Sequence, residues 1–286
     1  MIRQDEEIVV TARRTGIPVW RATRGGSTLI LVGTIDDIAR GTPWNAGALA
    51  ATVCRSDRVM YPQSVGLRAS PFQMIGWLAK WKKQSKLPTG QSLSVLLNGR
   101  DRDRLARLSA QGLAPRNWDR MHPLHLAFEM RDILGKRTGL APRAAVTVDQ
   151  AARKHKVTRV AIARGRASPF AREFFASSPR DHLGCLTATL AMSEAGPSEL
   201  RRRSLAWSNR RVASALSSPV EAVEKQCWPA TSGIRLSGDL AVTATRVLAG
   251  SGTTVAVIDL GALAERDGLL DRLQAVGIHI DGPDWR

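Results

Sequence analysis

The stretch Thr28-Leu29-Ile30-Leu31-Val32-Gly33-Thr34-Ile35-Asp36 decides the fold of this 286-residue chain. Its apolar and β-branched residues run without a polar interruption up to Gly33, and the turn signal Gly25-Gly26-Ser27 precedes them. An unbroken run of this length predicts a strand that is buried on both faces. A glycine near the strand end allows close packing there, and the carboxylate of Asp36 follows.

A second stretch near the C-terminus has the same pattern. Thr253-Thr254-Val255-Ala256-Val257-Ile258-Asp259 follows a glycine turn and also ends in a carboxylate. We expect residues 28–32 and 253–257 to be neighbouring core strands, with Asp36 and Asp259 near the same end of one sheet. If the two carboxylates lie within a few ångströms, like-charge repulsion raises the pKa of one of them.

The chain between these strands favours an α/β fold, with a central mixed sheet from the N- and C-terminal segments and a large α-helical insertion. Residues 18–23 are expected to form a hairpin with the first core strand. A helix over 43–54 and a strand over 57–61 complete a strand–helix–strand unit. We expect a single domain over 1–286, in which 1–65 and 236–286 form the sheet core and 66–235 the insertion, with one helix–strand unit near 149–163.

Shorter patterns indicate the remaining elements. Residues 7–12 are rich in β-branched side chains and are expected as a strand, and Thr42 is expected to cap the helix that opens at Pro43. The other expected helices cover 71–84, 93–112 (as two short helices), 123–134, 149–155, 168–177, 181–194, 197–216, 219–227, 237–249 and 267–276, and the other strands 158–163 and 278–280.

The composition is that of a folded and strongly basic protein. The chain has 42 Lys and Arg against 25 Asp and Glu, a formal net charge of +17, and 43% hydrophobic residues. The basic residues are scattered and no aromatic–basic stacking motif accompanies them, so we expect no nucleic-acid partner. No apolar run approaches the roughly 18 residues of a membrane span, so no transmembrane segment is expected.

Two sequence blocks carry a resemblance to a known family. The first is Pro18-Val-Trp-Arg with Leu29-Ile-Leu-Val-Gly-Thr-Ile35, and the second runs from Thr253-Thr-Val-Ala-Val257 to Asp267-Gly-Leu-Leu-Asp-Arg-Leu-Gln-Ala-Val-Gly-Ile278. They resemble the TraB/GumN family, related to the Tiki proteases and to the erythromycin-esterase/ChaN-like fold. In that family each strand runs into a Gly-x-x-His motif. Between the blocks, Trp207-Ser-Asn-Arg-Arg211 is similar to the family's Arg-Asn-containing helix.

The resemblance implies a metal-dependent hydrolase, in which two strand-end histidines and a glutamate hold a divalent metal and lower the pKa of its bound water. Here the histidine positions carry Asp36 and Ala262, and the acidic position falls at Tyr61. Alanine cannot ligate a metal, neutral tyrosine is a poor substitute for a carboxylate, and one aspartate does not make a site. We therefore expect no bound metal, no cofactor and no catalytic residue.

The first functional hypothesis is a catalytically degenerate TraB/GumN-like protein that binds an anionic small molecule or a cell-envelope polysaccharide-type ligand. Two alternatives stay open, namely a metal-dependent hydrolase or protease with a site rebuilt around Asp36, and a structural or interaction protein. The sequence does not determine the oligomeric state. The expected ligand-binding residues are Asp36, Asp37, Tyr61, Asn209, Arg210 and Asp259.

Each of these residues also has a structural interpretation. Asp36 and Asp37 are residue types that cap or turn a loop after a strand, and Asn209 and Arg210 fit the polar face of a helix. His122 and His125 are interpreted as histidines on a helix surface, because Pro123 falls between them at a helix start.

The three cysteines allow at most one disulfide within the chain. Cys185 and Cys227 lie in helical segments separated by another helix, so a helix out and a helix back lets them meet. Closing this loop of about 42 residues stabilises the fold by roughly 4 kcal/mol. Cys54 ends an apolar helix and is expected as a free, buried thiol.

The expected disulfide bears on the compartment of the protein. Such a bond needs an oxidising environment, so we expect a bacterial protein that is periplasmic or secreted, with a signal segment upstream of Met1. The alternative is a cytoplasmic protein in which Cys185 and Cys227 are two buried thiols.

Overall fold

Strands β2 (Ser27–Thr34) and β7 (Gly252–Asp259) lie side by side at the centre of the sheet, which confirms the prediction from their apolar runs. The two strands are parallel, from Ser27 opposite Gly252 to Thr34 opposite Asp259. The four β2 residues 29–32 are completely buried, as expected for a strand covered on both faces. The computed structural model describes residues 4–60, 66–68, 70–160, 164–227 and 230–286.

Four further strands complete a six-stranded mixed sheet in the order β5-β3-β7-β2-β1-β8. β1 (Val19–Arg24) forms the predicted antiparallel hairpin with β2, and β8 (His279–Asp281) pairs with β1 at one edge. On the other side, β3 (Arg58–Met60) runs parallel to β7, and β5 (Thr158–Arg159) runs parallel to β3. The strands β4 (Gly66–Arg68) and β6 (Arg164–Arg166) form a separate parallel pair.

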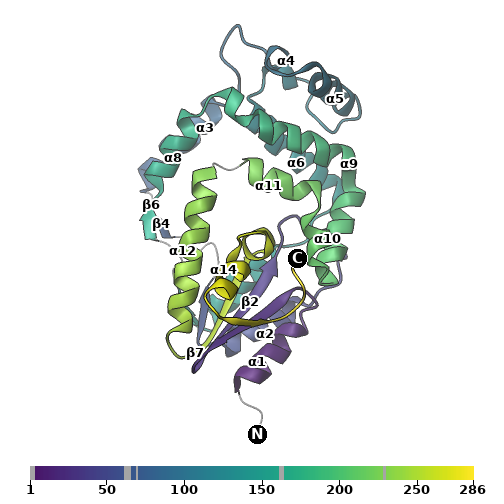
Figure 1. The fold of residues 1–286 in the computed structure, drawn as a ribbon. Helices are drawn as coiled ribbons and strands as arrows, with labels where there is room; N and C mark the ends of the chain where they lie inside the picture. Colours follow the sequence, from purple (N-terminus) through teal and green to yellow (C-terminus); the bar gives the residue numbers. More distant parts are fainter. Residues whose placement is uncertain (1–3, 61–65, 69, 161–163, 228–229) are drawn as a thin grey trace.

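Helices from the segments flanking the strands pack around this sheet. α1 (Gln4–Arg13) contacts α2 (Ala46–Arg55), which contacts α7 (Ala144–Lys154). α12 (Ala230–Leu248) contacts β2 and α14 (Leu269–Ala275), and both helices lie on the near side of the sheet in Figure 1. The short α13 (Leu260–Ala264) follows β7 directly. The apolar side chains of these helices share one buried cluster with the core strands.

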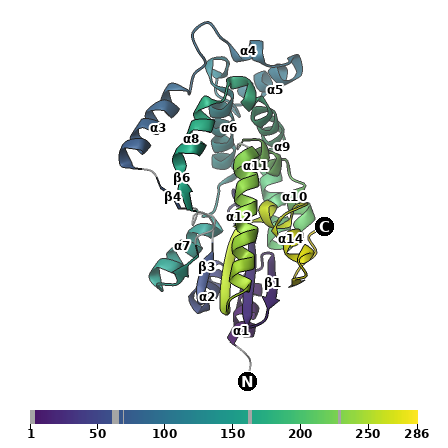
Figure 2. The same ribbon diagram turned by 60° about the vertical axis from the view of Figure 1, so that its left-hand side comes forward.

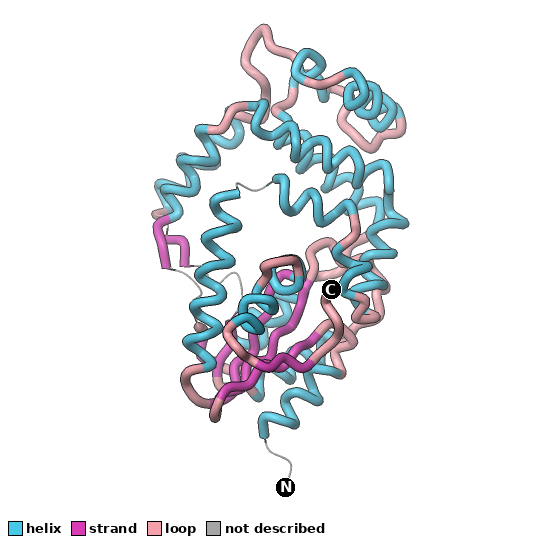
Figure 3. The backbone as a smooth tube through the Cα atoms, in the orientation of Figure 1, coloured by secondary structure: helices cyan, strands magenta, loops and turns pink. Residues whose placement is uncertain are grey.

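The helical insertion has a second apolar core. Figure 3 shows helices filling the upper part of the molecule, with the main sheet confined to the lower part. This core is built mainly on α6, α9 and α11. Separately, none of the described helices is long and apolar enough to cross a membrane. The elements of the insertion are α3 (Pro71–Lys83), α4 (Leu93–Leu96), α5 (Gly99–Ala110), η2 (Trp118–Arg120), α6 (Pro123–Thr138), α8 (Ala167–Ala176), η3 (Pro179–His182), α9 (Leu183–Ser208), α10 (Val212–Leu216) and α11 (Pro219–Cys227).

The predicted disulfide joins Cys185, near the start of α9, to Cys227, at the end of α11. Cys54 is free, as predicted, but it is half-buried instead of buried. The buried face of α2 passes through Leu49 and Val53, and Cys54 lies next to that face at the edge of the core.

Two predictions near the N-terminus were wrong. Residues 7–12 form part of α1 and not a strand, because Ile8, Val9 and Ala12 lie on one helical face and are buried against the sheet. Packing of this face overrides the β-propensity of the segment. The cap of α2 is Asn45 and not Thr42, since the Asn45 side chain accepts a hydrogen bond from the Ala48 amide at 2.9 Å.

Two helix boundaries also differ from the prediction. α9 is interrupted at Gly196, whose φ of +71° and ψ of −169° are not helical, so the break expected between residues 194 and 197 is present. Pro197 follows Gly196 directly, and a proline lacks a backbone donor and bends or ends the helix before it, which accounts for the break. The part after the break ends at Ser208 and not at residue 216, and the separate α10 covers Val212–Leu216. The helix expected over 149–155 begins five residues earlier, at Ala144, which is completely buried.

Gly33 is the point at which the core strand, the helical insertion and the C-terminal segment meet. Its carbonyl accepts a hydrogen bond of 2.8 Å from the indole of Trp207 on α9. A Cβ atom on Gly33 would lie 2.7 Å from Leu260 Cδ1 and 3.0 Å from the Trp20 ring. Only glycine therefore fits between these two buried side chains.

We expect the substitution Gly33→Ala to lower the free energy of unfolding by about 1–3 kcal/mol, because overpacking displaces two fully buried side chains. Gly26→Ala is the matched control, since Gly26 has no positive φ and nothing within 4 Å of an added Cβ. The control should remain within about 0.5 kcal/mol of wild type. Urea titration measures both, and equal stabilities of the two variants would contradict the close packing at Gly33.

Candidate functional site

The carboxyl ends of β2 and β7 meet beneath the helical insertion. Thr34 and Asp259 are opposite one another at this edge of the sheet, so Asp36, two residues beyond Thr34, belongs to the same edge, as predicted. Helices α6, α9 and α11 bring charged side chains to it. We define the strand-end cluster as Asp36, Asp37, Arg131, Arg203, Glu221, Glu224 and Asp259.

The centre of this cluster is an ion pair between Arg203 on α9 and Glu221 on α11. The two side chains are 1% and 5% exposed, and Arg203 Nε donates to Glu221 Oε1 at 2.8 Å. Burial raises the pKa of Glu221, against the effect of the guanidinium. Arg203 Nη1 also donates to the main-chain carbonyl of Asp36 at 2.7 Å. The pair therefore connects both helices to the loop that leaves β2.

A second arginine makes a parallel connection from α6. Arg131 Nε lies 2.6 Å from Asp37 Oδ2, and Arg131 Nη2 lies 2.5 Å from Glu224 Oε1. Asp37 has a left-handed backbone conformation, with φ 57°, and this ion pair holds its carboxylate in place. Each of the two loop aspartates is thus bound by an arginine of the insertion, Asp36 through its carbonyl and Asp37 through its side chain.

Asp259 caps a helix and also has a raised pKa. Its Oδ1 caps α13 by accepting hydrogen bonds from the amides of Gly261 (2.9 Å) and Ala262 (3.2 Å). Burial and the negative charge of Glu221 raise the pKa of Asp259 to about 7, against the effect of the Ala262 amide. The carboxylates that act on Asp259 are therefore those of Glu221 and, to a smaller extent, Glu224. The Asp36 carboxylate, 41% exposed, instead faces Arg143 Nε at 3.5 Å.

The other expected ligand-binding residues lie elsewhere. Asn209 is the C-cap of α9, and its side chain donates to the Leu205 carbonyl at 2.8 Å. Arg210, with φ 60°, follows in the turn before α10 and its guanidinium donates to the Arg13 carbonyl. Tyr61 lies outside the described residues.

Arg210 lines an open groove of about 280 Å³ near the start of β1 and the end of β8. Arg13 also lines the groove, with its guanidinium 2.6 Å from the Asp281 carboxylate. We call this the Arg210 groove, and its lining residues are Arg13, Val19, Arg210, Asp281, Gly282 and Pro283.

The residues present at the strand ends do not fit a metal site. Within the described part of the chain, no three His, Cys, Asp or Glu side chains are grouped so as to hold a metal ion. At the second motif position, Ala262 offers only a methyl group, and its amide is used in the cap of α13. The buried cation at this edge is the guanidinium of Arg203, which would repel a divalent ion.

Sequence reasoning missed the arginines and glutamates of the cluster. Arg203 belongs to a run of three arginines, and the basic residues were interpreted from the sequence only as scattered charge. A signal was present in α11, where Glu221, Glu224 and Cys227 follow one another at three-residue spacing and so share one helix face. A disulfide that binds this face to α9 also brings its carboxylates inward.

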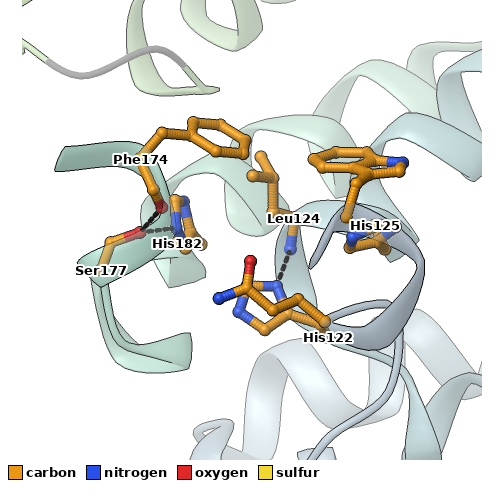
Figure 4. A pocket seen from close by; sticks show the side chains of 8 residues that line it. His122, Leu124, His125, Phe174, Ser177 and His182 are labelled. Atoms are coloured by element: carbon orange, nitrogen blue, oxygen red, sulfur yellow. Dashed lines mark hydrogen bonds between the residues drawn. The ribbon is translucent and has the colours of Figure 1, made fainter. Parts of the chain in front are cut away.

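Three histidines gather in the insertion, away from the strand ends (Figure 4). The rings of His122 and His182 are 5.3 Å apart, and Ser177 Oγ lies 2.7 Å from His182 Nε2. Trp81 packs on His125, with ring centroids 3.8 Å apart. Burial, with neighbouring His182, lowers the pKa of both His122 and His125 to about 4. The prediction of surface histidines was wrong, because the rings turn inward between α6, α8 and η3.

A family model supplies the relationship of the chain to known proteins. The model of the TraB/PrgY/gumN family matches residues 18–281, nearly the whole chain. Comparison with curated proteins and with solved structures gives no match.

We expect the variant Asp259→Asn to remove a pH dependence of stability that wild type shows between about pH 4 and pH 7. The native pKa of Asp259, about 7, lies above its ordinary value of 3.8, so the native state binds this proton more tightly than the unfolded state. The resulting stabilisation is complete below about pH 4 and is lost as the pH rises through about 7. Asparagine remains a good helix cap and does not titrate.

Urea titrations of both proteins at several pH values measure this effect. From about pH 5 to pH 8, the free energy of unfolding of wild type should fall relative to the variant by at least about 1.4 kcal/mol, the equivalent of one pKa unit. The histidines titrate in both proteins, so their contribution cancels in the difference. A difference that does not change with pH would contradict the assignment.

Proposed function

The chain belongs to the TraB/PrgY/gumN family, and from this premise we propose that it is a catalytically degenerate member that binds an anionic ligand. The ligand class is an anionic saccharide of the kind found in cell-envelope polysaccharides, and the proposed site is the Arg210 groove. The observation that carries the proposal is the pairing of charges at the strand ends. Arg203 is paired with Glu221, and Arg131 with Asp37 and Glu224.

This pairing argues against hydrolysis of the kind that the family resemblance implies. A metal-dependent hydrolase needs side-chain ligands and an open coordination position for water. The two motif positions here carry Asp36 and Ala262, and Glu221 is already bound to Arg203. The strand-end cluster acts in this proposal as a structural lock between the sheet and the insertion.

The Arg210 groove has the features of an anion site. Arg210 is held by two backbone interactions, since its amide donates to the Trp207 carbonyl at 3.0 Å and its side chain donates to the Arg13 carbonyl. Arginine presents several donors in a fixed plane, which suits carboxylate and phosphate groups. The volume of about 280 Å³ is close to the range of small-ligand sites, and a chain of net charge +17 attracts polyanions.

The disulfide between Cys185 and Cys227 supports an oxidising compartment. We therefore include in the proposal that the protein is periplasmic or secreted in a bacterium, where envelope polysaccharides are accessible.

A second candidate is an acid/base hydrolase that uses a rebuilt site without metal. The observation in its favour is the pKa of Asp259 near 7 beside Glu221, since carboxyl pairs with separated pKa values occur in acid/base sites. In this candidate the rebuilt site is centred on Asp259 and not on Asp36. Hydrolytic activity that is lost in Asp259→Asn, while ligand binding in the groove persists, would favour it.

Purified protein should contain far less than one equivalent of divalent metal per chain, because the strand ends lack a ligand set. Elemental analysis after incubation with Mn, Co or Zn and removal of free metal tests this expectation. About one tightly held ion per chain would overturn the degenerate assignment and restore the metal-dependent hydrolase.

We expect Arg210→Gln to weaken binding of a soluble uronic-acid polymer about tenfold or more, the loss of a charge-assisted hydrogen bond. Arg211→Gln is the matched control, since it removes the same charge from the next residue, which is exposed and does not line the groove. Calorimetric titrations at low and high salt give the affinities, and wild-type binding should weaken with salt. Equal affinities of the two variants would place the ligand elsewhere.

A further inference from the structure

Helix α3 presents an apolar face to solvent. Its residues Phe72, Met74, Ile75 and Leu78 are 85%, 50%, 64% and 63% exposed, and we call them the α3 face. Figure 2 shows α3 at the outer edge of the insertion, with α8 beside it. Exposed apolar side chains that gather in this way mark an interaction surface, unlike single apolar residues scattered over a protein.

The helix is specified by its own sequence and anchored at one end. Ser70 and Gln73 form a capping box, with backbone-to-side-chain distances of 2.9 and 3.2 Å, and Pro71 opens the helix. At the other end, Trp81 packs on His125 in the histidine cluster. None of the residues of α3 is buried. The helix is therefore formed and held in place while its apolar face has no partner within the described chain.

Several lysines follow the apolar residues of this face in the sequence, and no Asp or Glu lies near them in the sequence. Lys82 comes four residues after Leu78 and seven after Ile75, so it lies on the same side of the helix. Lys82, Lys83 and Lys86 are exposed, and the described residues include no ion-pair partner for them. The sequence from residue 58 to residue 100 contains seven Lys and Arg and no Asp or Glu. The ionised side chains of this segment of the chain are thus all positive.

This combination of charge and apolar side chains identifies the occupant. A second copy of the chain would place like charges against each other, which costs free energy. A soluble polyanion would pair with the lysines but leave Phe72 and Ile75 in water. An anionic bilayer takes up apolar side chains at the boundary of headgroups and acyl chains, and its phosphates meet lysines that extend along the apolar surface.

We propose that α3 docks the protein on an anionic lipid bilayer. The α3 face enters the interface, and Lys82, Lys83 and Lys86 contact the lipid phosphates. The docking surface is separate from the Arg210 groove and does not depend on the function proposed for it.

Sedimentation with phospholipid vesicles tests the proposal. Full-length protein should sediment with phosphatidylcholine vesicles that contain about 30% phosphatidylglycerol, and at least about tenfold less with pure phosphatidylcholine or at high salt. The double variant Phe72→Ser/Ile75→Ser and the double variant Lys82→Gln/Lys83→Gln should each reduce binding about tenfold or more. Circular dichroism of each variant confirms that it is folded.

Two control variants keep the comparison matched. Val95→Ser removes an apolar residue that is 80% exposed on α4, and Lys154→Gln/Lys156→Gln removes two exposed lysines at the end of α7. Both should bind vesicles as wild type does. Failure of wild type to bind, or equal binding by wild type and Phe72→Ser/Ile75→Ser, would overturn the proposal.

Two further measurements separate this proposal from other outcomes. Sedimentation equilibrium without lipid should show no effect of Phe72→Ser/Ile75→Ser on the oligomeric state. A dimer that dissociates in this variant, with no vesicle binding, would identify a second copy as the occupant and overturn the proposal. Binding of the uronic-acid polymer should be unchanged in the same variant, so failure of lipid docking is distinguishable from failure of the groove.

Discussion

The buried ion pair of Arg203 and Glu221 is the interaction on which the arrangement of sheet and insertion depends. Two charged groups that leave water need nearly complete hydrogen bonding to be tolerated in a protein interior. Arg203 meets this requirement with the Glu221 carboxylate and the Asp36 carbonyl. The two helices and the strand-end loop must therefore lie where Arg203 reaches both acceptors.

The strand-end cluster has the opposite charge balance to the rest of the chain. Five carboxylates there face the guanidinium groups of Arg131, Arg203 and, beside Asp36, Arg143, in a protein whose formal net charge is +17. Burial, together with the negative charges of Glu221 and Glu224, raises the pKa of Asp259 to about 7. The excess of carboxylates also means that an anionic ligand is repelled from the edge of the sheet where related motifs place catalytic residues. In our proposal such a ligand binds instead in the Arg210 groove.

Sequence patterns predicted the parts of this structure that depend on local periodicity. The unbroken apolar runs of β2 and β7 identified the central strands, and the glycine turn before β2 identified the hairpin. The disulfide followed from cysteine number and helix order. The α1 helix was missed because its β-branched residues are equally compatible with a strand, and only packing against the sheet decides between them. The Arg203–Glu221 pair and the histidine cluster join residues on different elements, so no pattern in one segment could reveal them.

The disulfide has a consequence for the assembly of the buried pair. Cys185 and Cys227 enclose both Arg203 and Glu221 in a covalent ring of about 42 residues. In the oxidised unfolded chain these two groups remain tethered at a high effective concentration, so less entropy is lost when they meet. Reduction opens the ring and enlarges the conformational space that the chain must search, although the pair itself is the same in the folded state. The disulfide thereby lowers the entropic cost of bringing Arg203 and Glu221 together during folding.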